Sequence, residues 1–496
     1  MHRRGAFAVR AGALLFIGAG AASAVGPDIK LCRLYDLRQF GRELNGGVYQ
    51  VGLAAATRSW NVGTANVNWW SSPDSRHPFI ALNVYRLLNG RFEQIGLNFV
   101  KHGFYAESDI SCGGTGSCAG DSTGRTLGVG CDDLYGASLN SFQNYLGPRF
   151  EINPWTGGWN YTTSIFNGSP PVTSTVERRL RIRESDLTVF SATSNPTGVM
   201  YFLEGYYIAA DDVNIWNSGA WKPITGMAFN ATSSTWTFTV SNSTVLPNEG
   251  FAIDAWTAQQ GARQTLVAQE LPVVENVAQN PMEDWSPDGR AIVASRVTPN
   301  TNGTFHFEYA VFNIDMDRQI GSFSVPVPCG VCVSNIGFSA VPHFTEPTNS
   351  VGGKAIDNTP WVGTRTYSAV EWRTPRIEQP EPSNPIRWGM LFNFRFDAST
   401  DKVDGLVELG LFKPPPAGGP TAILGLTDVP GSAPVCAGDA NCNCLVNFGD
   451  IVEILAGFGS VYTLGTSGFG DSNGDGLVDF TDVIYTLAHF NQDCLP

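Results

Sequence analysis

The sequence predicts a mainly β protein, with one or two β-sandwich-like domains followed by a small α-helical module. Three observations support this prediction. The 496 residues include 55 Gly, 30 Pro, 30 Phe, 14 Tyr and 13 Trp but only 15% charged residues, which suits short strands joined by tight turns. Aromatic residues alternate with polar residues in several short runs. Near the end of the chain, two acidic, asparagine-rich loops each precede a helical apolar pattern.

The first 24 residues have the pattern of a secretory signal peptide. Three arginines precede an apolar stretch at residues 11–22, and Ala22-Ser23-Ala24 supplies small residues for cleavage. We therefore expect a secreted or cell-surface-associated protein. No later segment has 18 uninterrupted apolar residues, so we expect no membrane span. The formal net charge of −14 argues against nucleic acid as a partner.

Composition shifts divide the rest of the chain. Residues 27–195 are expected to form a β-rich domain with a Cys/Gly-rich loop at 111–130, and residues 196–412 a β-sandwich domain. Residues 413–435 hold many prolines and no sustained periodicity, which predicts an extended linker. Residues 436–496 then form the last module.

The clearest strands are predicted in the second of these domains. Residues 305–312 and 236–240 alternate aromatic or aliphatic residues with polar ones, as half-buried strands do. Residues 391–396 form a third aromatic run, and Asn302-Gly303 is one of the turns that separate such runs. This pattern predicts a sandwich, because no amphipathic helix interrupts the strands as in a βαβ unit.

The twelve residues DSNGDGLVDFTD at 471–482 place oxygen atoms as an EF-hand loop does. Gly476 lies at loop position 6, where the chain turns sharply. The sequence therefore predicts a Ca²⁺ site. The predicted ligands, Leu477 through its carbonyl, are Asp471, Asn473, Asp475, Leu477, Asp479 and Asp482.

A weaker copy of this loop, DANCNCLVNFGD, begins 32 residues earlier, with Cys444 at the glycine position. It has two carboxylates against four in the later loop, so we expect it to bind Ca²⁺ less tightly. Its predicted ligands are Asp439, Asn441, Asn443, Leu445, Asn447 and Asp450. Apolar residues at spacings of 3 and 4 after each loop predict one helix per loop.

Paired loop–helix units without the entering helix of an EF-hand resemble dockerins, and the resemblance covers about 436–496. It implies Ca²⁺ as cofactor and a cohesin-like or cell-surface protein as partner. The sequence departs from the dockerin pattern at Asn443 and Cys444, and at the loop ends, where Phe448-Gly449 and Phe480-Thr481 retain only one hydroxyl. The body, residues 27–412, resembles uncharacterised secreted bacterial β-rich proteins, a resemblance that implies no activity.

Ten cysteines remain after residue 24, an even number in each predicted unit, which predicts structural disulfides. Cys329 and Cys332 have CxxC spacing and His343 follows. We favour a local disulfide between them over zinc or thiol redox chemistry.

In the last module Cys442 and Cys444 are one residue apart, so a bridge between them would be strained. We expect each to pair with Cys436 or Cys494.

No catalytic motif is present in the body. His77, His102 and Asp132 are a conceivable constellation without local support. A glycoside hydrolase would need two converging carboxylates, for which the candidates are Asp132, Asp133, Glu151, Asp211, Asp212, Asp254 and Asp284. Exposed tryptophans could stack on a polysaccharide, for which the candidates are Trp69, Trp70, Trp155 and Trp159.

The sequence therefore favours a secreted Ca²⁺-binding protein whose tail docks to an extracellular partner and whose body has a binding, structural or adhesive role. The alternative is a polysaccharide-active glycoside hydrolase that carries a dockerin.

Overall fold

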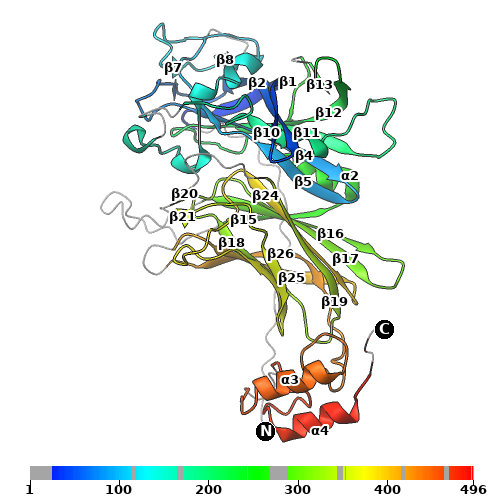
Figure 1. Cartoon of the computed structure of the whole chain (residues 1–496). Coiled ribbons are helices and arrows are strands. Elements are labelled where there is room, and N and C mark those ends of the chain that lie inside the picture. Colours follow the sequence, from blue (N-terminus) through cyan, green and yellow to red (C-terminus); the bar gives the residue numbers. More distant parts are fainter. Residues whose placement is uncertain are drawn as a thin grey trace, which may run out of the picture.

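The computed structural model describes residues 25–113, 118–164, 167, 171–242, 244–268, 289–342, 350–351, 354–414, 419–462, 468–492 and 494. The predicted signal peptide and Asp284 lie outside these residues. The described residues form three parts in a row: a β-barrel, a β-sandwich and a two-helix tail (Figure 1). The prediction of a mainly β protein is confirmed.

The first part is a closed barrel of eight antiparallel strands, not a sandwich. Following the hydrogen bonds around the barrel, the strands are β1 (Ile29–Asn45), β2 (Val48–Asn61), β10 (Leu180–Arg183), β5 (Arg91–Leu97), β4 (Phe79–Leu88), β11 (Met200–Ile208), β12 (Gly219–Asn230) and β13 (Thr235–Val240). β13 pairs with β1 and so closes the circle. Aliphatic side chains such as Leu53, Val84 and Leu203 fill the interior.

The barrel corrects the predicted boundary at residues 195–196. Strands β11, β12 and β13 follow that boundary, yet they pair with strands that precede it. The strand signals were local, whereas the pairing of β11 with β4 joins residues more than 100 positions apart, so the circle could not be inferred from periodicity.

Short elements cover the barrel. These are β3 (Val67–Asn68), β6 (Val100–His102), β7 (Thr126–Leu127), β8 (Asp132–Tyr135), β9 (Leu146–Gly147), β14 (Asn248–Glu249), α1 (Ala137–Asn140), α2 (Asp254–Gln260) and four short 3₁₀ turns. Two disulfides, Cys32–Cys112 and Cys118–Cys131, hold the Cys/Gly-rich loop against the barrel.

The second part is a sandwich of two five-stranded antiparallel sheets, as predicted for this region. The first sheet runs in the order β15 (Arg263–Ala268), β16 (Arg290–Pro299), β17 (Phe305–Asn313), β24 (Met390–Ala398) and β19 (Val333–Ala340). The second runs in the order β22 (Val362–Arg365), β23 (Ala369–Arg373), β18 (Ile320–Pro326), β25 (Lys402–Leu411) and β26 (Ala422–Pro430). A separate pair is formed by β20 (Ser350–Val351) and β21 (Lys354–Ala355).

The first sheet is buried on both faces. Phe307 and Tyr309 on β17 enter the core between the two sheets, while Ala310 and Phe312 pack against the barrel and α2. The half-buried strand predicted at residues 305–312 is therefore covered on its second face from Phe307 onward. This second contact fixes the sandwich to the barrel.

Strand β26 corrects the predicted linker. Residues 422–430 pair along their whole length with β25, and Ile423 and Val429 enter the sandwich core. The prolines that suggested a linker flank this strand or occupy its last position, where a missing N–H is tolerated at a sheet edge.

Candidate metal centre

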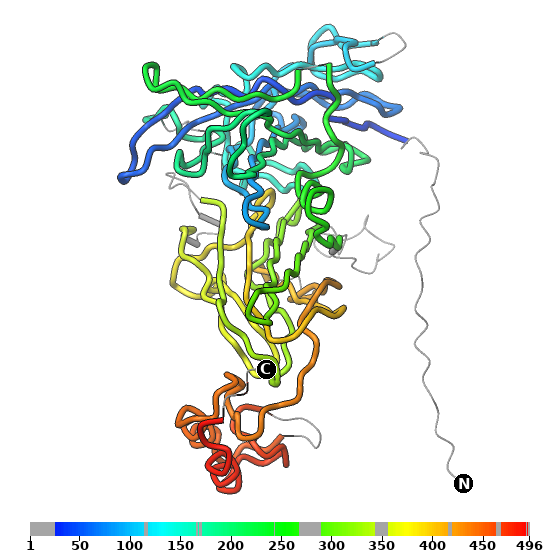
Figure 2. The backbone as a smooth tube through the Cα atoms, turned by 90° about the vertical axis from the view of Figure 1, so that its right-hand side faces the viewer, coloured from blue at the N-terminus to red at the C-terminus, as the bar shows by residue number. Residues whose placement is uncertain are grey.

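The tail contains the two predicted helices, α3 (Phe448–Ala456) and α4 (Phe480–Ala488), at the end of the sandwich away from the barrel (Figures 1 and 2). Each begins in a capping box: the side chain of Asn447 or Asp479 accepts a backbone hydrogen bond from the first turn, and Asp450 or Asp482 bonds back to the cap residue. The two helices therefore start in the same way, one from each predicted loop.

The last residue of each loop binds the loop's beginning. Asp450 accepts from the backbone N–H groups of Asn441 (3.1 Å) and Asn447 (2.8 Å). Asp482 accepts from those of Asn473 (3.1 Å) and Asp479 (2.9 Å), the residues 32 positions later.

The first residue of each loop repeats this correspondence. Asp439 accepts from the backbone of Cys444 at 2.8 Å, and Asp471 accepts from the equivalent Gly476 at 3.1 Å. Both carboxylates thus point into their loops, and each oxygen keeps a further lone pair that could bind a cation.

Side chains at loop positions 3 and 5 also point inward in both loops. Asn441 and Asn473 accept from the N–H two residues later, at 3.1 and 2.9 Å. Asn443 and Asp475 do the same, both at 2.9 Å. The sequence-predicted oxygen ligands of each loop are therefore gathered around its interior.

The two loop–helix units exchange their ends. Val446 of the first loop pairs with the segment after α4, through Val446 N to Gln492 O (3.0 Å) and Asn491 N to Val446 O (2.7 Å). Val478 of the second loop pairs with the segment after α3 through the equivalent bonds, at 3.0 and 2.8 Å. Every partner is displaced by 32 residues. The units are therefore related by an approximate twofold axis, around a small core of Ala440, Ile454 and Val478.

The loops differ where the chain turns in the left-handed region. The second loop has Gly474 (φ +75°) and Gly476 (φ +87°), whereas the first has Cys442 (φ +58°) and Cys444 (φ +67°). A residue with a Cβ in this region costs about 1–2 kcal/mol. The first loop nevertheless keeps the same backbone, so another interaction must hold it.

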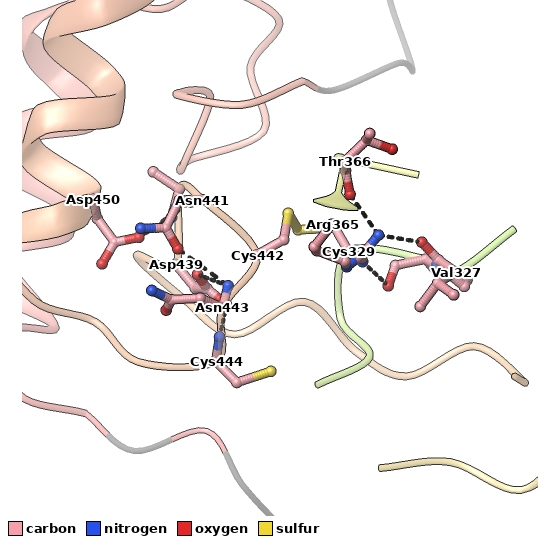
Figure 3. Close-up of a disulfide and its surroundings, with 12 residues drawn as sticks. Val327, Cys329, Arg365, Thr366, Asp439, Asn441, Cys442, Asn443, Cys444 and Asp450 are labelled. Carbon is pink, nitrogen blue, oxygen red and sulfur yellow. Dashed lines mark hydrogen bonds between the residues drawn. A yellow bond between two sulfur atoms is a disulfide. The ribbon is translucent and has the colours of Figure 1, made fainter. Parts of the chain in front are cut away.

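That interaction is a pair of disulfides to the sandwich, Cys329–Cys442 and Cys332–Cys444 (Figure 3). The predicted local disulfide between Cys329 and Cys332 is therefore wrong, as is the predicted pairing of Cys442 and Cys444 with Cys436 or Cys494. Cys436 and Cys494 instead bond to each other. The expectation of disulfides within domains failed because the tail folds back onto the turn before β19.

Further contacts fix the tail to the sandwich. The Arg365 guanidinium binds the carbonyls of Val327 (2.9 Å) and Pro328 (2.8 Å) and lies toward Asp439 (Figure 3). The ring of Tyr367 meets that of Phe469 edge-on, with centroids 5.6 Å apart. The tail is thus attached by more than one covalent chain and is not tethered by residues 431–435 alone.

The electrostatics of the loops favour a cation. Residues 436–496 contain no Lys or Arg. Burial, with the nearby Asp450 charge, raises the pKa of Asp439 to about 6, and burial with Asp482 raises that of Asp471. A divalent ion would reverse these costs.

Within the described ranges, no three His, Cys, Asp or Glu side chains form a cluster of the kind that holds a metal. The donor set of each loop relies on asparagine and backbone oxygens as well as carboxylates, which is the chemistry that Ca²⁺ prefers. The residues present therefore fit Ca²⁺ in their type and order along each loop.

The tail also exposes a duplicated apolar face. Phe448 (68% exposed) and Leu455 (60%) on α3 match Phe480 (64%) and Leu487 (53%) on α4. Three further exposed pairs at the same 32-residue spacing are Leu445 and Leu477, Val452 and Ile484, and Phe458 and Phe490. Contiguous exposed apolar residues of this kind mark interaction surfaces.

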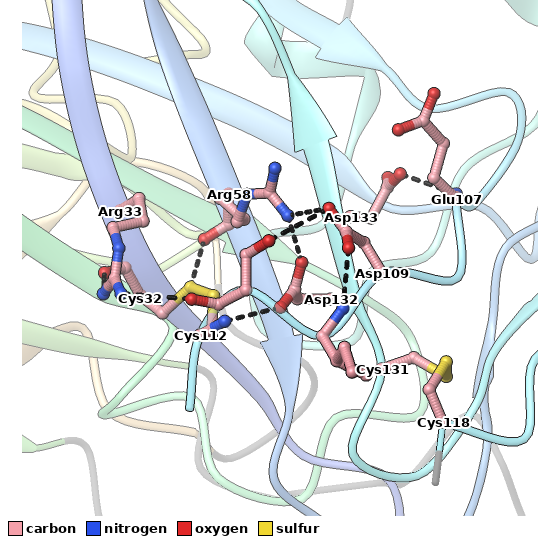
Figure 4. A network of polar contacts seen from close by, with 12 residues as sticks. Cys32, Arg33, Arg58, Glu107, Asp109, Cys112, Cys118, Cys131, Asp132 and Asp133 are labelled. Atoms are coloured by element: carbon pink, nitrogen blue, oxygen red, sulfur yellow. Dashed lines mark hydrogen bonds and ion pairs between the residues drawn. A yellow bond between two sulfur atoms is a disulfide. The ribbon is translucent and has the colours of Figure 1, made fainter. Parts of the chain in front are cut away.

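The body does not gather the predicted acids into a cleft. Asp132 and Asp133 are 0% and 1% exposed. Asp132 binds the Arg58 guanidinium and the backbone of Cys112, and Asp133 accepts from Glu107 N at 2.7 Å (Figure 4). Burial raises the pKa of Asp133 well above its ordinary value. These carboxylates secure the disulfide-bonded loop and are inaccessible to a polysaccharide.

The two histidines meet without Asp132. His77 Nε2 lies 2.8 Å from His102 Nδ1, and both rings pack against Phe79 and Trp159. Burial lowers the pKa of both, that of His77 to about 4, so the pair is neutral at pH 7. Its surroundings are those of a packed core.

The other candidate acids have local structural partners. Glu151 accepts from Ser164, Asp211 from Asn68 and Asp212 from Ser218, while Asp254 begins α2. The tryptophans are also engaged: Trp69 and Trp159 are buried, Trp70 is covered by Arg76 and Arg125, and Trp155 lies near Arg290.

No protein-family model matches the chain, and no curated protein is significantly similar to it in sequence. In the part of the chain that the structure describes, no helix is both long and apolar enough to cross a membrane. All cysteines are in disulfides, which is typical of oxidising, extracellular surroundings.

Proposed function

We propose that the protein is secreted, that its tail binds two Ca²⁺ ions, and that the tail then docks to an extracellular partner. The body has a binding, structural or adhesive role. The observation that carries the proposal is the duplicated loop: two sets of inward-facing oxygens, with the same hydrogen bonds 32 residues apart, surround four buried carboxylates. None of these four carboxylates has an ion-pair partner among the described residues.

Ca²⁺ would be held in the second loop by Asp471, Asn473, Asp475, the carbonyl of Leu477, Asp479 and Asp482, and in the first by the equivalent residues from Asp439 to Asp450. The ion would neutralise the carboxylates and fix the start of each helix. This chain's own part is to orient those oxygens through the backbone hydrogen bonds of the loop.

The docking proposal is supported by the resemblance to dockerins and by the duplicated apolar face. Because that face lies on a module without Lys or Arg, its partner should be a protein with an apolar surface bordered by basic residues. A second copy of this tail would bring like charges together and is a poorer fit. A hydrolase receives no comparable support, because the acids examined in the body serve local structure.

Surface plasmon resonance against an immobilised cohesin domain tests docking. We expect binding in Ca²⁺ that is lost in EDTA and in Phe448→Ser/Phe480→Ser, a variant that should still bind Ca²⁺ because both side chains point away from the loops. The matched control is Val403→Ser, at an exposed apolar position on the sandwich. Absence of binding, or equal binding by the double variant, would refute docking through this face.

A further inference from the structure

The two disulfides that join tail and sandwich enter the first loop between its oxygen ligands. Cys442 and Cys444 are loop positions 4 and 6, and they flank Asn443 at position 5. At the equivalent positions the second loop has glycines, which adopt the left-handed backbone without a steric cost. The same backbone is therefore obtained by composition in one loop and by covalent attachment in the other.

The receiving turn on the sandwich is well held. Val331 is fully buried and its N–H binds Pro328 O at 3.0 Å. Cys332 exchanges hydrogen bonds with Ser399, both at 3.0 Å. At Gly330 a Cβ would lie 2.3 Å from Ala433 O, so the chain leading to the tail packs directly on this turn. A turn fixed in this way can hold the first loop in its strained form.

We propose that the interdomain disulfides set the Ca²⁺ affinity of the first loop, so that this site is sensitive to reduction and the second is not. The inference rests on the proposed Ca²⁺ binding. With the disulfides intact, the cost of two left-handed cysteines is met when the protein folds and oxidises. With them reduced, the empty loop can relax, and Ca²⁺ must restore the strained backbone when it binds.

The coupling is reciprocal, because a change that weakens the ion must itself be opposed by the ion. All four cysteines are 8% exposed or less, so a thiol reaches their sulfur atoms only when the loop opens. Reduction of each bridge by a dithiol transfers two electrons: a thiolate attacks one sulfur, a mixed disulfide forms, and the second thiol closes a cyclic disulfide. Two cysteine thiols are released.

Calorimetry on the full secreted chain tests the proposal with two matched variants. Cys329→Ser/Cys332→Ser/Cys442→Ser/Cys444→Ser removes the bridges and keeps side chains at the left-handed positions. We expect weaker binding at the first loop by about tenfold or more, with the second within about twofold. Asp482→Ala, introduced into each chain, silences the second loop and so assigns the sites.

The variant with Cys442→Gly and Cys444→Gly in place of the two serines lacks the bridges but gains the glycines of the second loop. It should recover most of the lost affinity. Cys118→Ser/Cys131→Ser, which removes a barrel disulfide, should change neither site. An unchanged first site in the serine variant, or equal losses in the serine and glycine variants, would overturn the proposal.

A second measurement keeps the proposal testable should the serine variant fail to fold. Native protein is exposed to dithiothreitol with and without Ca²⁺, and reduced cysteines are alkylated and mapped by mass spectrometry. Ca²⁺ should slow reduction of Cys329–Cys442 and Cys332–Cys444 but not of Cys118–Cys131. Equal rates with and without Ca²⁺ at the first two bridges would contradict it, whereas native protein that binds no Ca²⁺ would refute the proposed function itself.

Discussion

The two loops of the tail reach the same backbone by different chemistry. The second uses Gly474 and Gly476 and four carboxylates, whereas the first uses two cystines and two carboxylates. The first also lies beside the positive charge of Arg365, which should repel a cation. The second loop is therefore built to bind an ion, and the first to bind an ion while also fixing the tail to the body.

The difference teaches that a departure from a sequence pattern can carry information. Cys444 at a glycine position reads as a defect when the loop is considered alone. In the fold, Cys444 and Cys442 are the attachment points that set the direction of the tail relative to the sandwich. A docked partner would then be held at a defined angle to the barrel.

The largest expected effect comes from truncation at the attachment. A chain ending at residue 412 lacks β26 and its core residues Ile423 and Val429, at a cost of about 2–5 kcal/mol each before lost strand pairing is counted. This approaches the whole stability of a domain, about 5–15 kcal/mol. We expect the sandwich to lose its near-UV circular dichroism.

A chain ending at residue 431 and carrying Cys329→Ser/Cys332→Ser is the control, because it keeps β26. It should resist proteolysis as the native body does. A stable, protease-resistant chain ending at 412 would show that β26 is dispensable and that the predicted linker was right.

The next effect separates the two ion sites. Asp482→Ala removes a buried carboxylate that closes the second loop, and should weaken the tighter site by at least the ~10–100-fold typical of lost supporting groups around a metal. Asp450→Ala should weaken only the looser site. Calorimetry in which Asp450→Ala removed the tighter site would reverse our ranking of the loops.

The comparison also predicts a pH dependence. The pKa of Asp439 is raised to about 6, above the ordinary value of about 3.9, so the Ca²⁺-free folded state binds this proton more tightly than the unfolded state does. Its stability therefore falls as pH rises through that interval. Ca²⁺ must displace the proton, so first-loop affinity should be about tenfold lower at pH 5 than at pH 7. Equal affinities at the two pH values would remove this carboxylate from the site.

The smallest effect tests backbone conformation alone. A Cβ at Gly474 would meet nothing within 4 Å, whereas one at Gly476 would lie 3.3 Å from Tyr462 O. Gly474→Ala should weaken the second site by about fivefold, equivalent to ~1 kcal/mol, through its positive φ. Gly476→Ala should cost more because crowding is added. The opposite order in a Ca²⁺ titration would show that the left-handed backbone is not what limits the loop.

Local features were predictable from the sequence and distant ones were not. The loop oxygens and the starts of α3 and α4 depend on residues within twelve positions, so their spacing was sufficient. The bridge from Cys329 to Cys442 spans 113 residues, and barrel closure joins β4 to β11 across a comparable stretch. Periodicity along one strand contains no information about such partners.

Burial on both sides was also beyond the sequence pattern. Alternation at residues 305–312 predicted one covered face, but Phe312 packs on the barrel while Tyr309 packs in the sandwich. The sequence-predicted Asp132 and Asp133 show the converse limit: their acidity suggested chemistry, whereas their partners Arg58 and Glu107 N give them a structural role. Only the three-dimensional contacts distinguish the two.

The central claim is that both loops bind Ca²⁺, and anomalous diffraction from crystals grown with Ca²⁺ tests it most directly. The account predicts two peaks, one inside each loop, each with oxygen ligands at about 2.3–2.6 Å drawn from residues 439–450 or 471–482. The first peak should lie beside Asn443, between the two interdomain disulfides. Absence of a peak from either loop at saturating Ca²⁺, or peaks bound only by residues outside them, would contradict the account.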